Sequence, residues 1–140
     1  MRANAIAFVA LVCSAACSGS TSDVGDRFPD EAYEHVDSTS GAYSIDVRTS
    51  PQPPRVGVGA VELRVRGRGG APADGLAFQF SLVMPAPAHG ASVKPTVEPK
   101  GEGVYVVRSV STYMAGTWEL RAVIQEGAAS DQATITLDVR

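Results

Sequence analysis

Cysteine is almost absent from this sequence, and its absence limits the chemistry of the folded part. The chain has 140 residues and two cysteines, Cys13 and Cys17, both within the first 17 residues. A disulfide framework, a zinc–thiolate site and a cysteine nucleophile are therefore excluded from everything that follows Cys17. Any domain there must be held together by burial of apolar side chains and by strand pairing.

Positive charge and histidine are also scarce. Lys and Arg number 12 against 15 Asp and Glu, so the formal net charge is −3 and the basic surface of a nucleic-acid-binding protein is missing. There are two histidines, and the sequence contains no G-x-S-x-G, H-E-x-x-H or phosphate-loop motif. We therefore predict that the protein is not an enzyme.

A hydrophobic run long enough to span a membrane is missing too, but a short one lies near the N-terminus. Residues 3–12 are almost wholly apolar, whereas a spanning helix needs about 20 such residues. This run and the small residues 14–16 are typical of a secretory signal peptide, which we predict over residues 1–16. The small residues before Cys17 resemble a bacterial lipobox, although Ser14 stands where Leu is usual. The resemblance implies a lipidated Cys17 and a chain anchored to a bacterial membrane; an ordinary signal peptide is the alternative.

An acidic segment follows the cysteine. Residues 18–40 carry six acidic residues and one basic residue, with weak apolar periodicity. Low hydrophobicity combined with net charge is typical of flexible segments. We predict that residues 17–40 are a lipidated cysteine and a flexible tether, in which His35 is a solvated side chain. The domain would then face the periplasm or the cell exterior.

From Tyr43 onward, apolar and polar residues alternate with a period of two, which predicts half-buried strands. Gly- and Pro-rich turns separate the runs, and no helical period occurs. About seven short antiparallel strands at this spacing predict an all-β, immunoglobulin-like β-sandwich over residues 41–140. Residues 93–97 would form an edge strand because Pro95 has no N–H to donate. The expected core consists of Phe78, Phe80, Trp118, Leu120 and Ile135.

Two segments carry a resemblance beyond this pattern. They are Met84-Pro85-Ala86-Pro87-Ala88-His89-Gly90, and Gly101-Glu102-Gly103-Val104-Tyr105 followed by Tyr113-Met114-Ala115-Gly116-Thr117-Trp118. Together they resemble the YtkA-like domain family, related to the periplasmic part of FixH proteins, over about Tyr43 to Arg140. The resemblance implies a small sandwich outside the cytoplasmic membrane, linked to assembly of copper-containing oxidases or to heavy-metal efflux. Ala86 and Ala88 stand where the family often has further ligands.

The residues themselves suggest a metal site made of Met84, His89 and Met114. Thioether and imidazole groups suit Cu(I). Met84 ends one predicted strand and Met114 precedes another, so antiparallel pairing of these strands would bring both to one pole. His89 lies on the loop that leaves Met84. The alternative is that the methionines fill the core and that the His89 imidazole bonds to the backbone of a turn.

These observations favour a membrane-anchored, envelope-facing accessory lipoprotein that binds copper or aids metalloenzyme assembly. Its expected partners are membrane lipid, through the N-terminal anchor, and a metalloenzyme or transporter of the envelope. The alternative is a metal-free protein-interaction module of the cell envelope. A sandwich serves both roles, so the fold does not decide between them.

Overall fold

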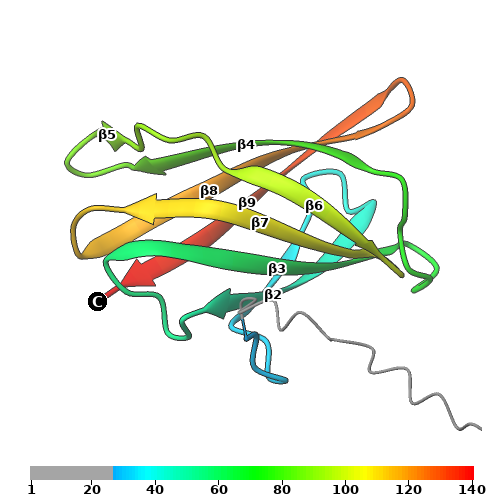
Figure 1. Cartoon of the computed structure of the whole chain (residues 1–140). Coiled ribbons are helices and arrows are strands. Elements are labelled where there is room, and N and C mark those ends of the chain that lie inside the picture. Colours follow the sequence, from blue (N-terminus) through cyan, green and yellow to red (C-terminus); the bar gives the residue numbers. More distant parts are fainter. Residues whose placement is uncertain (1–26) are drawn as a thin grey trace, which may run out of the picture.

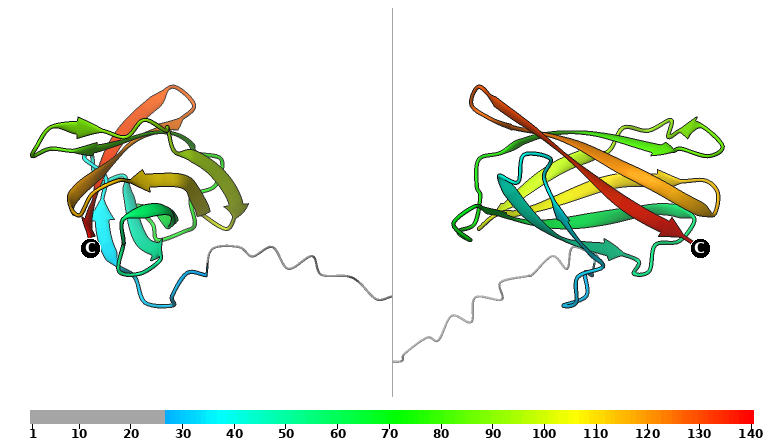
Figure 2. Two further views of the ribbon diagram at one scale, coloured as in Figure 1. Left: turned by 60° about the vertical axis from the view of Figure 1, so that its left-hand side comes forward. Right: turned by 180° about the vertical axis from the view of Figure 1, so that it is seen from behind.

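Two antiparallel sheets packed face to face make up the computed structural model, which describes residues 27–140 (Figure 1). The first sheet contains, in spatial order, β1 (Glu34–Asp37), β2 (Tyr43–Ser50), β3 (Gly57–Gly67), β7 (Val104–Thr112) and β6 (Thr96–Gly101). The second contains β5 (His89–Gly90), β4 (Ala77–Met84), β8 (Gly116–Glu126) and β9 (Ala129–Val139). Seen from behind, the long β8–β9 hairpin crosses the strands of the first sheet (Figure 2). The predicted all-β sandwich is confirmed.

The expected edge strand is present but begins later than the sequence pattern suggested. Strand β6 starts at Thr96, directly after Pro95, and ends at Gly101. It pairs only with β7 and borders the first sheet. This position tolerates Pro99 within the strand, because an edge strand does not need every N–H for its ladder.

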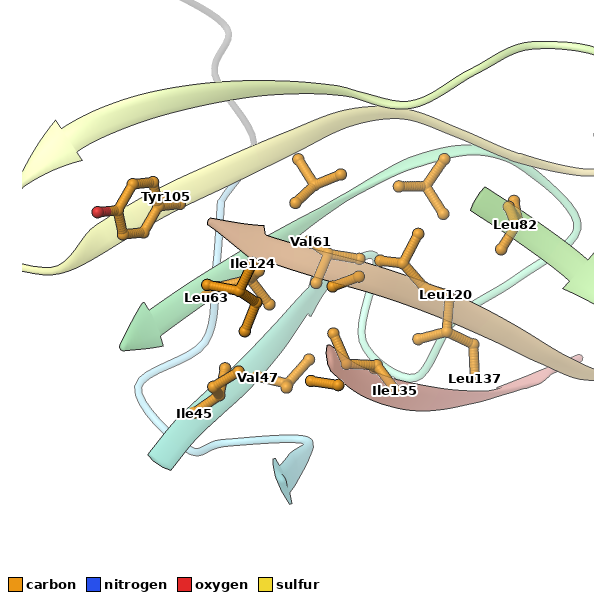
Figure 3. Packing of buried hydrophobic residues seen from close by; sticks show 14 of the residues in the cluster. Ile45, Val47, Val61, Leu63, Leu82, Tyr105, Leu120, Ile124, Ile135 and Leu137 are labelled. Carbon is orange, nitrogen blue, oxygen red and sulfur yellow. The ribbon is translucent and has the colours of Figure 1, made fainter. Parts of the chain in front are cut away.

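The hydrophobic core lies between the sheets and is built from the alternating residues (Figure 3). Trp118, Leu120 and Ile135 are fully buried, as predicted. Phe78 and Phe80 were also expected in the core, but both are only partly buried. The reason is that the outer neighbour of β4 is the two-residue β5, which pairs with the far end of β4 and leaves this half of the strand at an edge.

Tyr105 fixes the crossing from the first sheet to the second. Its hydroxyl donates to the Ala73 carbonyl at 2.8 Å and accepts the Leu76 N–H at 3.1 Å. Close by, Gly103 has φ +73, and a Cβ there would lie 2.4 Å from the Val65 carbonyl oxygen. Only glycine fits that approach, so this turn packs directly against β3.

Part of the predicted tether belongs to the sandwich. Residues 34–37 form β1, which pairs antiparallel with β2, and Tyr33 and Val36 pack against the core. His35, expected to be solvated, bonds through Nδ1 to Asp46 Oδ1 at 2.9 Å while its side chain stays 57% exposed. The folded region therefore begins before residue 41. The composition of this segment did not reveal the strand, because its acidic residues face water or a backbone N–H while the apolar residues between them pack against the core.

The predicted signal peptide and Cys17 lie outside the described residues. Within residues 27–140, no helix is long and apolar enough to cross a membrane.

Candidate metal centre

One pole of the sandwich collects the three residues proposed as ligands. Strand β4 runs antiparallel to β8, with Val83 opposite Glu119, so the end of β4 meets the beginning of β8. β5 folds back on β4 and places His89 opposite Met84. The turn between β7 and β8 carries Met114 to the same pole (Figure 1).

Met84 and His89 face each other across a strand pair. Opposed residues on antiparallel strands point to the same face of the sheet, with Cβ atoms about 4.5–5.5 Å apart. Met84 is only 2% exposed, and a Cβ added to Gly116 would lie 3.0 Å from the Met84 methyl carbon. The Met84 side chain therefore packs beneath the β7–β8 turn. Met84 and His89 also line one open surface hollow, together with Pro85 and Arg121.

Met114 is held by the buried tryptophan. Its side chain is 37% exposed, while its carbonyl oxygen accepts the Trp118 Nε1–H at 3.1 Å. Trp118 itself has no exposed surface. A buried indole N–H normally finds a hydrogen-bond partner, and here that partner fixes the backbone of the turn. The Met114 thioether is thus presented from a fixed main chain.

Tyr113 joins the two loops, and the sequence reasoning missed it. Its ring lies 5.2 Å from the Trp118 ring, at 84°, and 6.1 Å from the His89 ring, at 62°. The contact brings His89 beside the loop that carries Met114. The sequence did offer one indication of Tyr113, because it directly precedes Met114 in the motif already described.

The three candidate ligands at this pole are one imidazole and two thioethers. Within residues 27–140, no three His, Cys, Asp or Glu side chains are grouped to hold a metal ion. Within residues 27–140, these four residue types therefore offer no candidate site for a hard cation. Imidazole and thioether together suit a soft ion such as Cu(I).

Comparison with known proteins gives one result. A protein-family model described as YtkA-like matches residues 37–123. The matched range contains Met84, His89 and Met114, and it starts at the last residue of β1. No curated protein and no solved structure matches the chain significantly.

Proposed function

The chain belongs to the YtkA-like family, and from that premise we propose that it is a membrane-anchored, envelope-facing accessory lipoprotein that takes up Cu(I) as cargo. The proposed ligands are Met84, His89 and Met114. One observation carries this proposal: His89 is opposed to Met84 across β4 and β5, and its ring contacts Tyr113, the neighbour of Met114.

The differing exposure of the three side chains suits a transfer site. Met84 is buried, whereas His89 is exposed and Met114 is 37% exposed. An ion bound there would be coordinated by the buried thioether of Met84 and by two accessible donors, the His89 imidazole and the Met114 thioether. Such an ion remains open to attack by ligands of an acceptor, which an accessory of metalloenzyme assembly or of a metal transporter requires.

Cu(I) titration under reducing conditions, in competition with a chromogenic chelator, tests the metal site. We expect one equivalent to bind to the parent chain. His89→Ala and Met114→Leu should each weaken affinity at least about tenfold, since even outer-shell partners of a metal site are worth that much. Met84→Leu removes the sulfur and keeps the core volume. His35→Ala is the matched control, because it removes the other histidine, which lies on β1. A parent chain without stoichiometric binding would refute the copper proposal.

Fractionation of cells tests the anchor. Cys17→Ser should release the protein into the soluble envelope fraction, because acyl chains supply about 0.8 kcal/mol per buried methylene. Cys13→Ser is the matched control and should stay with the membrane. If Cys13→Ser releases the protein while Cys17→Ser does not, the wrong cysteine has been assigned.

A metal-free interaction module remains the second candidate because the same pole exposes apolar side chains. Val58 is 74% exposed, Tyr113 52% and Val56 47%. Val58 lies opposite Ser111, and Tyr113 directly follows the end of β7, so the three residues lie at the same end of the first sheet. Exposed apolar groups gathered at one place mark interaction sites. Failure of the parent chain to bind Cu(I) would favour this second function for the pole.

A further inference from the structure

Residues 30–40, here called the strap, are tied to the first sheet along β2. β1 forms a four-residue antiparallel pair with β2. The ladder continues with the Tyr33 N–H donating to the Val47 carbonyl at 2.7 Å. Further back, the Arg48 guanidinium donates to the Asp30 carbonyl at 3.0 and 3.2 Å. The strap therefore adds an edge to the first sheet.

The same residues reach across to the second sheet and cap β9. Glu34 Oε2 accepts the Thr136 N–H at 3.0 Å, and the Tyr33 hydroxyl oxygen accepts the Asp138 N–H at 3.0 Å. Burial of the Glu34 carboxyl raises its pKa, although the bond from Thr136 opposes that rise. Both acceptors are side chains, so the strap covers these backbone groups without forming a ladder with β9.

The turn after β1 makes further contacts with β9. The Thr39 N–H donates to the Gln132 carbonyl at 2.7 Å. Ser40 donates to Asp131 twice, from its hydroxyl at 2.6 Å and from its N–H at 3.1 Å. The strap is thus hydrogen-bonded to β9 both at Tyr33 and Glu34 and at Thr39 and Ser40.

The outer edge of β9, which faces away from β8, is therefore covered by the strap. β9 has eleven residues and borders the second sheet, pairing only with β8. The N–H groups of Thr136 and Asp138 point away from β8, and by the two-residue period of a strand the N–H of Thr134 does so too. A long edge of this kind pairs with another strand unless something covers it.

We propose that the strap is a removable guard, and that when it lifts away the outer edge of β9 pairs antiparallel with β9 of a second copy. Antiparallel pairing of a strand with itself is two-fold symmetric, so every contact is satisfied twice. The buried residues Ala133, Ile135 and Leu137 share one face of β9. In the pair, this apolar face would continue from one copy into the other.

The hinge and the location of the strap fit such a movement. The turn that joins it to β2 contains Gly41 at φ +68, where a Cβ would meet nothing within 4 Å. Apart from the part-buried bond between Glu34 and Thr136, its side-chain hydrogen bonds to Gln132, Asp131 and Asp138 lie at the protein surface. Surface contacts of this type open at low free-energy cost. Anchoring on a shared membrane surface, which rests on the proposed function, would raise the local concentration of copies.

Light scattering of the full chain in detergent, combined with amide exchange, tests the proposal independently of copper. The parent should be monomeric. Glu34→Lys with Val36→Asp should release the strap and double the mass of the protein. Amide exchange at Thr136 and Asp138 should be faster than in the parent only at dilutions where the variant is monomeric, because pairing with a second β9 protects these N–H groups again. Adding Thr134→Pro should restore the monomer, because this proline removes an outward N–H and spares the ladder with β8.

Three results would overturn the inference. One is a released, folded variant that remains monomeric at every concentration. Another is a dimer that persists with Thr134→Pro, which would place the contact elsewhere. The third is amide protection at Thr136 and Asp138 that stays at the level of the parent in the dilute, monomeric variant. The fluorescence of Trp118, the only tryptophan, reports whether the double variant is folded. If it is not, Glu34→Ala alone is expected to give a concentration-dependent dimer, and its absence would count equally against the proposal.

Discussion

Removing one oxygen atom from Tyr105 should destabilise the domain more than the small change in volume suggests. The side chain is 2% exposed, and its hydroxyl satisfies two backbone groups, the Ala73 carbonyl and the Leu76 N–H. Leu76 is itself buried, at 8% exposure. In Tyr105→Phe, both backbone groups lose their partner at a place with little access to water.

The magnitude follows from the cost of leaving buried polar groups unpaired. Each such group costs about 1–3 kcal/mol, so the loss of two partners in Tyr105→Phe should lower the free energy of unfolding by roughly 2–6 kcal/mol. For a domain of this size, 1 kcal/mol corresponds to about 4–8 °C in Tm, so the midpoint should fall by at least about 8 °C. Thermal unfolding followed by circular dichroism measures this directly.

Tyr43→Phe is the matched control, with the same chemical change at a different place. The Tyr43 hydroxyl donates to Glu126 Oε2 at 2.6 Å, and this bond raises the pKa of Tyr43 to about 12. Glu126 is exposed, so water can replace the lost donor and the cost should be about 0.5–1.5 kcal/mol. If Tyr105→Phe melts as high as Tyr43→Phe, the crossing from β3 to β4 is not held by the hydroxyl and the reasoning fails.

Two other changes test the core and the strap. Trp118→Ala removes a fully buried aromatic side chain and should cost about 3–5 kcal/mol, enough to abolish cooperative unfolding at ordinary temperature; a melt within a few degrees of the parent would contradict the assigned strand register. Burial opposes ionisation of Asp131, but hydrogen bonds from Ser38, Ser40 and Gln132 outweigh it and lower its pKa from 3.8 to about 2. Because the folded-state pKa is the lower one, this stabilisation is present above pH 3.8 and is lost as the pH falls toward 2. The stability advantage of the parent over Asp131→Asn should therefore shrink across that interval in acid titrations, and an advantage that does not change with pH would contradict the assignment.

The sequence predicts the sheets well because alternation is a local signal. Trp118, Leu120 and Ile135 are buried where the period of two put them. Phe78 and Phe80 follow the same period, yet they are only partly buried. What decides their exposure is which strand lies beyond β4, and that depends on the order of strands rather than on the residues of β4.

The candidate site shows the same division between local and distant information. The antiparallel relation of β4 and β8 makes the pole where Met84 and Met114 lie predictable from strand ends alone. Tyr113 was missed because a tyrosine after a strand has no distinctive local pattern. Its role depends on two ring contacts, and His89, one of those partners, lies 24 residues earlier in the sequence.

The strap is the clearest case of information that composition cannot supply, and it changes how the domain should be delimited. The acidic segment was predicted to be a flexible tether, but Glu34 accepts a hydrogen bond from Thr136, 102 residues further along the chain. A fragment beginning at Gly41 would lack β1 and would leave the caps of β9 unmade. Copper titrations on such a fragment would measure the pole of a molecule whose β9 edge has lost these hydrogen bonds. The family match begins only at Asp37, but the strap contacts begin at Asp30. The first residue of a soluble form should therefore lie before Asp30, so that the strap and its bond to Arg48 are kept.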